Sequence, residues 1–158
     1  MVPWRRLRAL GSADRRLLAE TGLLLLLARI GLWVAPFPVL RRVLDGPRPP
    51  RLAPRPEFSD RVAWAVVAVA RRLPGMTCLV QSLAAHALLQ RRGCRPALHI
   101  GVRRGVRGRG SGAAEFLDAH AWVECDGRVV AGEIDDLVEY QLLTPVEPAA
   151  SSSASVPP

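Results

Sequence analysis

The chain has 158 residues, 49% of them hydrophobic, and a formal net charge of +8 at pH 7. This length fits one domain with a modest core. Every basic residue is an arginine, and the few aromatic residues do not alternate with them, so the charge does not indicate a nucleic-acid-binding surface. The three cysteines form no Cys-x-x-Cys pair, and the charged N-terminal stretch lacks a secretory-signal pattern. These features predict a cytoplasmic protein with reduced thiols and no zinc site.

The most apolar segment runs from Thr21 to Leu40. A membrane-spanning helix needs about 20 mostly apolar residues without charge. Arg29 lies in the middle of this segment, and Pro36 and Pro38 interrupt its end. We therefore expect a buried or surface-associated helix rather than a span, with weak membrane association as a further expectation.

Helices are predicted through the first part of the chain, each bounded by a capping or helix-breaking residue. Thr77 is the expected N-cap of the last helix, and Gly93 is its expected stop. A proline- and arginine-rich linker is expected before the third helix. The predicted helices are, in chain order, Ser12–Ala35, Val39–Gly46, Ser59 or Asp60 to Leu73, and Cys78–Arg92.

After Gly93 the apolar residues alternate, which predicts strands. Strands are expected at residues 96–104, at 116–125 and, after an Asp126-Gly127 hairpin turn, at 127–135. Helices followed by an antiparallel sheet predict an α+β fold. The expected organisation is an N-terminal helical region (1–46), the linker (47–58), a core (59–143) and a disordered tail (144–158).

Cys78 stands at the predicted start of a helix. The unpaired N–H groups and the dipole at a helix N-terminus lower the pKa of a thiol, so this is a favoured place for a nucleophile. The alternative is a small buried cysteine that happens to begin a helix. Nothing in this segment alone decides between the two.

His120 lies in the middle of the predicted second strand. Alternation places it on the face of Asp118, Trp122 and Glu124, opposite the apolar residues. A two-residue turn at Asp126-Gly127 would place Glu133 opposite His120, with Asp135 on the diagonal. Either carboxylate is a candidate to orient the imidazole, and the alternative is that both are solvated turn residues.

A helix-borne Cys, a later strand-borne His and a carboxylate on the next strand have the order of a Cys-His-Asp/Glu triad. This order resembles the transglutaminase-like cysteine peptidase superfamily. The stretch from Cys78 to about Asp135 is more closely similar to the stand-alone leader peptidases of lasso-peptide biosynthesis. The residues that carry the resemblance are Cys78, Ser82-Leu83, Leu88 or Leu89, Gly93, Ile100-Gly101-Val102, and His120 to Glu124 with Gly127.

The resemblance implies a papain- or transglutaminase-like core in which the Cys78 helix packs on a small antiparallel sheet. It implies that Cys78, His120 and either Glu133 or Asp135 cleave a precursor peptide without a cofactor or a metal. The family usually has an aspartate as its third residue, which favours Asp135, whereas the hairpin register favours Glu133. The resemblance also implies two partners: a separate leader-recognition protein and an ATP-dependent lasso cyclase.

Two rival functions use other features of the chain. A transglutaminase-like acyltransferase would use the same residues but pass the acyl group to an amine. A non-enzymatic membrane-surface protein would use the leucine-rich helix and the arginines. Release of free leader peptide would separate the peptidase from both rivals.

Overall fold

The computed structural model describes residues 11–46, 49–50, 56–107 and 114–146. Within these ranges the helices precede the strands, so the predicted α+β class is confirmed. A short 3-10 helix (Leu137–Glu139) lies between the last two strands. The helices are α2 (Ser12–Val34), α3 (Phe37–Asp45), α4 (Pro56–Ala70) and α5 (Cys78–Arg91), and the strands are β1 (Ala97–Arg107), β2 (Ala114–Cys125), β3 (Arg128–Ala131) and β4 (Gln141–Val146).

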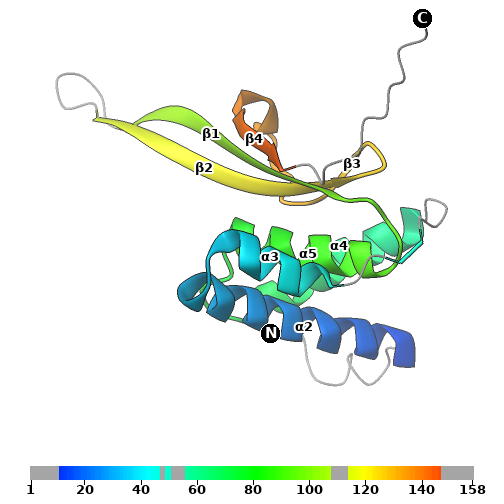
Figure 1. Ribbon diagram of the computed structural model, residues 1–158. Helices are drawn as coiled ribbons and strands as arrows, with labels where there is room; N and C mark the ends of the chain where they lie inside the picture. Colours follow the sequence, from blue (N-terminus) through cyan, green and yellow to red (C-terminus); the bar gives the residue numbers. More distant parts are fainter. Residues whose placement is uncertain (1–10, 47–48, 51–55, 108–113, 147–158) are drawn as a thin grey trace, which may run out of the picture.

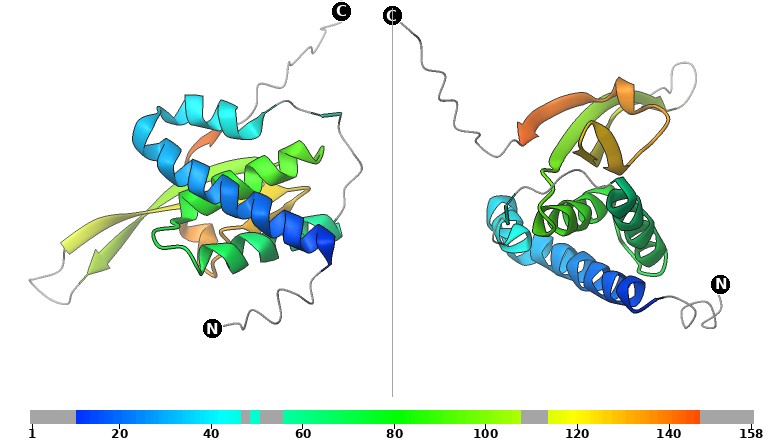
Figure 2. Two further views of the ribbon diagram at one scale, coloured as in Figure 1. Left: turned by 90° about the horizontal axis from the view of Figure 1, so that it is seen from below. Right: turned by 90° about the vertical axis from the view of Figure 1, so that its right-hand side faces the viewer.

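The helices form one layer, and the sheet packs above it (Figure 1). Helix α5 lies at the centre, in contact with α2, α3, α4 and the sheet. Every residue from Ser82 to Gln90 is buried. This position explains why the helix is rich in alanine and leucine on all sides, because a helix surrounded by protein needs no polar face. Figure 2 shows the same two layers from below and from the side.

The sheet is antiparallel, with strand order β3-β2-β1-β4. Strand β2 packs on α5, and β3 packs on α4. Leu98 of β1 pairs with Val123 of β2, and both belong to the core that the sheet shares with the helices. The opposite face carries polar and aromatic side chains. The segment from Gly132 to Tyr140 connects β3 at one edge of the sheet with β4 at the other.

Several predicted boundaries are wrong. Helix α4 begins at Pro56 rather than at Ser59 or Asp60, since proline suits the first turn of a helix, where its missing N–H costs nothing. The same helix ends at Ala70 rather than at Leu73. Strand β4 extends to Val146, into residues that were expected to be a disordered tail, because these residues pair with the free edge of β1. Residues 147–158 lie outside the described part of the chain.

Helix α2 has an inner and an outer side. It is long and apolar enough to cross a membrane by length and composition, which by itself is weak evidence for a span. Its inner side belongs to the core, where Leu24, Leu25 and Ala28 are almost fully buried. Its outer side exposes apolar residues, among them Ile30 and Trp33. One side of α2 therefore belongs to the core, and the other side exposes apolar side chains.

Candidate active site

Cys78 is the first residue of α5, and Thr77 defines that start. Thr77 is extended (φ −67°, ψ 167°), and its hydroxyl accepts a hydrogen bond from the N–H of Val80 at 3.4 Å. The predicted N-cap is thus confirmed. The Cys78 thiol is half-buried at the end of the helix where the dipole favours negative charge.

Helix α5 presents this end to β2. The buried Ser82 side chain, one helical turn after Cys78, donates a hydrogen bond to the carbonyl oxygen of Ala121 at 2.9 Å. Residues four apart lie on the same side of a helix. The backbone of β2 at Ala121, the residue after His120, is therefore joined to α5 one turn after Cys78.

His120 is held in a defined tautomer. Its Nε2 lies 2.7 Å from the carbonyl oxygen of Gly132. A carbonyl oxygen can only accept, so Nε2 carries the hydrogen, and Nδ1 of the neutral ring is an acceptor. The ring of Tyr140 lies 5.6 Å from the His120 ring, and the nearly parallel ring of Trp122 lies 6.3 Å away. The imidazole is therefore fixed on one side while Nδ1 has a lone pair to take up a proton.

The hairpin after His120 has the predicted turn but not the predicted register. Asp126 and Gly127 both have positive φ, and Cys125 pairs with Arg128. The register then shifts, because Val123 pairs with Ala131 and β3 ends there. The predicted pairing of Trp122 with Ala131 is wrong, and so is the pairing of His120 with Glu133 that was derived from it. A β-bulge in a short edge strand is the physical reason.

The backbone of Gly132, and not a carboxylate side chain, contacts the imidazole of His120. Gly132 has φ +81°, and a Cβ there would overlap the carbonyl oxygen of Ala121 and lie 2.9 Å from the Cα of Trp122. This close approach brings the backbone to His120, so that the Gly132 carbonyl is the acceptor for Nε2. Glu133 and Asp135 are both exposed. A catalytic role for either carboxylate stays a prediction.

A polar network adjoins His120 on the same face of the sheet. The hydroxyl of the buried Tyr140 donates to Asp118 at 2.7 Å. Arg103 donates to the same carboxylate oxygen at 3.2 Å, and its guanidinium lies 4.8 Å from the centre of the Tyr140 ring. Arg103 also bonds two acidic residues of the segment that crosses the sheet, Asp136 and Glu139.

These contacts shift the pKa values of the network. The hydrogen bond from Tyr140, reinforced by Arg103, lowers the pKa of Asp118, and His120 contributes in the same direction. The same hydrogen bond raises the pKa of Tyr140, as do burial and the nearby charge of Cys78. Tyr140 and His120 therefore lie side by side on this face, and a shared site with Cys78 stays a prediction.

The other two cysteines lie elsewhere. Cys125 is buried on the helix-facing side of β2, opposite the face of His120, and Cys94 packs against the same core. Burial, together with the neighbouring Cys94 thiol, raises the pKa of Cys125 to about 12. It is therefore a neutral thiol at physiological pH. Within the described ranges, no three His, Cys, Asp or Glu side chains gather as a metal site would require.

A thiol at a helix start, a histidine on the strand packed against it and an antiparallel sheet define a papain- or transglutaminase-like core. The model of the transglutaminase-like superfamily matches residues 18–144. The chain therefore belongs to this superfamily, whose activities are of the cysteine peptidase and acyltransferase type. No curated protein and no solved structure was found to match the chain. The match extends from α2 to β4, so it includes the N-terminal helices.

Sequence reasoning missed three residues of this site. Strand alternation placed Asp118 on the face of His120, but nothing in the sequence gave it a role there. Gly132 carried a weaker signal, since an isolated glycine at a strand end often marks a close backbone approach. Tyr140 carried none, because it reaches the site only through the long segment that crosses the sheet.

Proposed function

We propose that this protein is a cysteine peptidase that removes the leader peptide from a ribosomally synthesised lasso-peptide precursor. The observation that carries the proposal is the tautomer of His120, which leaves Nδ1 as a proton acceptor on the strand that Ser82 joins to the Cys78 helix. The resemblance of the segment from Cys78 to Asp135 to lasso leader peptidases supports the choice of substrate.

In the proposed reaction, Nδ1 of His120 takes the proton of the Cys78 thiol, and the thiolate attacks the carbonyl carbon of the scissile amide. The imidazolium then gives this proton to the leaving amine, which departs as the amide bond breaks and a thioester forms. Water, activated by His120, hydrolyses the thioester and restores the thiol. The Gly132 carbonyl keeps the ring in register through both proton transfers.

The start of α5 would stabilise the charge that develops on the substrate oxygen. Thr77 already occupies two N–H groups of the first turn, since its hydroxyl accepts from Val80 and its carbonyl accepts from Gln81. The N–H groups of Cys78 and Leu79 are the remaining candidates for an oxyanion hole. The carboxylate of Glu133 or Asp135 would stabilise the imidazolium by its charge, while the backbone holds the ring.

The proposed partners are those of a stand-alone peptidase: a precursor peptide, a separate leader-recognition protein that delivers it, and an ATP-dependent cyclase that closes the ring. Delivery by a partner raises the local concentration of substrate, so the recognition protein should accelerate cleavage. We place the reaction in the cytoplasm, where the precursor is made.

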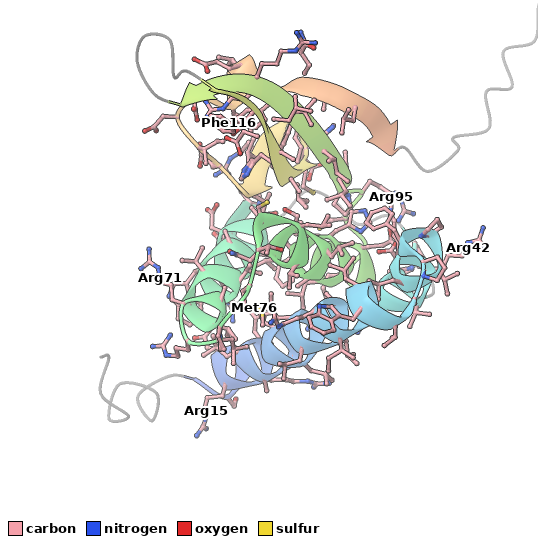
Figure 3. All side chains as sticks on the ribbon, turned by 90° about the vertical axis from the view of Figure 1, so that its left-hand side faces the viewer. Arg15, Arg42, Arg71, Met76, Arg95 and Phe116 are labelled. Carbon is pink, nitrogen blue, oxygen red and sulfur yellow. The ribbon has the colours of Figure 1, made fainter. Side chains whose placement is uncertain are left out.

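The outer side of α2 supports a further proposal, weak association with an anionic membrane surface. Its exposed apolar residues share the helix with Arg15 and Arg16, and α3 carries Arg42; all three arginines are exposed. Arg15 and Arg42 lie near opposite ends of the helical layer (Figure 3). An apolar stripe flanked by arginines matches the acyl boundary and the anionic headgroups of a bilayer.

The test of the peptidase is to incubate a precursor with the protein, with and without the recognition protein, and to measure free leader by mass spectrometry. We expect cleavage that the recognition protein accelerates and that Cys78→Ala abolishes. Cys94→Ala is the matched control and should still cleave. Cleavage by Cys78→Ala at the normal rate would refute the proposed mechanism. Transfer of the acyl group to an added amine in preference to water would identify the rival acyltransferase.

A further inference from the structure

The loop that leads into Cys78 is anchored from another helix. Arg29 of α2 reaches across to this loop, and its Nη1 donates a hydrogen bond to the carbonyl oxygen of Gly75 at 2.6 Å. Arg29 is the charge that interrupts the most apolar segment of the chain. Gly75, which accepts this hydrogen bond, lies three residues before the proposed nucleophile. The charge of Arg29 therefore has a structural role in the loop.

Gly75 fits this anchor in two ways. It has φ +71°, a conformation that favours glycine, and a Cβ there would lie 2.5 Å from the guanidinium carbon of Arg29. The guanidinium therefore packs directly on the backbone of the loop. Any side chain at this position would push Arg29 away from the carbonyl that it binds.

The next two residues are held by α5 itself. The side chain of Gln81 donates to the carbonyl oxygen of Met76 at 2.8 Å, and Thr77 caps the helix. The N–H of Thr77 donates to the Gly75 carbonyl at 3.1 Å, so this oxygen is shared between the cap residue and Arg29. Figure 3 shows Met76 within the helical layer, beneath the sheet. Among these contacts, the one from Arg29 ties the loop to a separate part of the fold.

We propose that Arg29 is a positioning residue for Cys78. By holding the Gly75 carbonyl, it fixes the peptide planes that enter α5, and with them the direction of the Cys78 side chain and of the first N–H groups. A carbonyl turned toward Arg29 also stays away from the negative charge that forms on the thiolate or on the substrate oxygen. The inference rests on the proposed function in that Cys78 is the nucleophile.

The experiment compares Arg29→Met with Arg71→Met, which removes an exposed arginine just after α4, and with Arg29→Lys, which keeps one donor. Two quantities are measured: the single-turnover rate of leader removal, and the rate at which iodoacetamide alkylates Cys78 as a function of pH, resolved by peptide mass spectrometry. Alkylation reports on the thiol whether or not the precursor is the true substrate.

We expect Arg29→Met to slow leader removal by about 10- to 100-fold with little change in KM, the size of effect that a small misplacement of a reacting group produces. Its alkylation profile should move to higher pH, because the thiolate loses the ordered helix N-terminus. Arg29→Lys should recover part of both effects, and Arg71→Met should behave as the unmodified protein.

Equal cleavage rates and equal alkylation profiles for Arg29→Met and Arg71→Met would overturn the positioning role. A changed profile for Arg29→Met, with no cleavage by any protein in the set, would support the positioning role and overturn the peptidase instead. If Arg29→Met does not fold, Gly75→Ala is the second variant. It keeps the arginine at position 29 but pushes its guanidinium away from residue 75, and the same shift in the alkylation profile is expected. An unshifted profile in folded Gly75→Ala would also refute the role.

Discussion

His120 shows how a single side chain can be prepared for proton transfer by the backbone. The Gly132 carbonyl accepts from Nε2 at 2.7 Å, which leaves Nδ1 as the acceptor for a thiol proton. In many triads a carboxylate orients the imidazole and fixes its tautomer. Here the carboxylates that sequence reasoning selected, Glu133 and Asp135, are exposed, and the ring is already held without them.

We therefore expect neutralising either carboxylate to have a modest effect. Glu133→Gln and Asp135→Asn should each slow single-turnover cleavage by about ten-fold or less, the size of a solvent-exposed charge interaction. His120→Ala should slow it by about 10²–10⁴-fold, because general acid–base catalysis is lost. A loss of 100-fold or more in one carboxylate variant would contradict this expectation. It would identify that carboxylate as a direct partner of His120 in the substrate complex.

Asp118 gives the site a dependence on pH. Its hydrogen bond from Tyr140, with the help of Arg103, lowers its pKa below the ordinary 3.8. A lowered pKa stabilises the folded state above the ordinary value, and this contribution is lost as the pH falls through the lowered pKa. The unfolding temperature of the unmodified protein should therefore exceed that of Asp118→Asn at neutral pH, and the two should converge below about pH 4.

Asp60→Asn is the control for this measurement, because Asp60 forms an exposed pair with Arg128. Its effect on the unfolding temperature should be small throughout. A difference between the unmodified protein and Asp118→Asn that stays constant down to pH 2 would refute the assignment of the pKa.

At the scale of the elements, α5 and the β2–β3 hairpin together carry the candidate site residues. The helix supplies the thiol at its capped start, and Ser82 fixes it against β2. The hairpin supplies His120 and, after the bulge, the glycine that approaches β2 closely enough to bind the ring. Neither element forms the site alone.

Gly132→Ala tests this coupling. The added Cβ would overlap the Ala121 carbonyl, and φ +81° is unfavourable for alanine, so we expect a loss of about 1–3 kcal/mol in unfolding free energy. Cleavage should slow because the chain at residue 132 moves away from His120. The imidazole nitrogen shifts of His120, measured by NMR, should show that Nε2 has lost its acceptor.

Gly127→Ala is the matched control. Gly127 also has positive φ (77°), but a Cβ there meets no atom within 4 Å. This variant should lose stability through its backbone alone and leave the nitrogen shifts of His120 unchanged. Equal changes at His120 in both variants would show that the close approach at Gly132 is not what holds the ring.

At the scale of the whole molecule, the candidate site and the exposed apolar side of α2 belong to different layers. Cys78 begins α5, the helix that packs on the sheet, and His120 belongs to the sheet itself, whereas α2 closes the helical layer on the side away from the sheet (Figure 1). A surface could therefore bind α2 without covering Cys78. This separation is compatible with a peptidase that works at a membrane surface.

The membrane proposal predicts sedimentation of the protein with vesicles that contain phosphatidylglycerol, and less sedimentation with pure phosphatidylcholine or at high salt. The double substitution Ile30→Gln and Trp33→Gln should abolish it, since these side chains are 59% and 83% exposed on α2. Val138→Gln, at an apolar residue that is 94% exposed beside the sheet, is the control and should bind normally. Equal sedimentation of all three proteins would refute the assigned surface.

Local patterns in the sequence determined much of this protein. Apolar periodicity, caps and turn residues depend on near neighbours, so they predicted the α+β order, Thr77 as the cap before Cys78, and the Asp126-Gly127 turn. Strand alternation, another local property, separated the face of His120 from the face of Cys125.

Only the tertiary structure decided what surrounds Cys78 and His120. One inserted residue in β3 shifted the register and replaced a carboxylate by the Gly132 carbonyl, and no local pattern marks such a bulge. Tyr140 and Arg29 reach the site or its loop from segments distant in the chain. Their contacts depend on how the helical layer and the sheet pack, and packing is a property of the whole chain rather than of any short stretch.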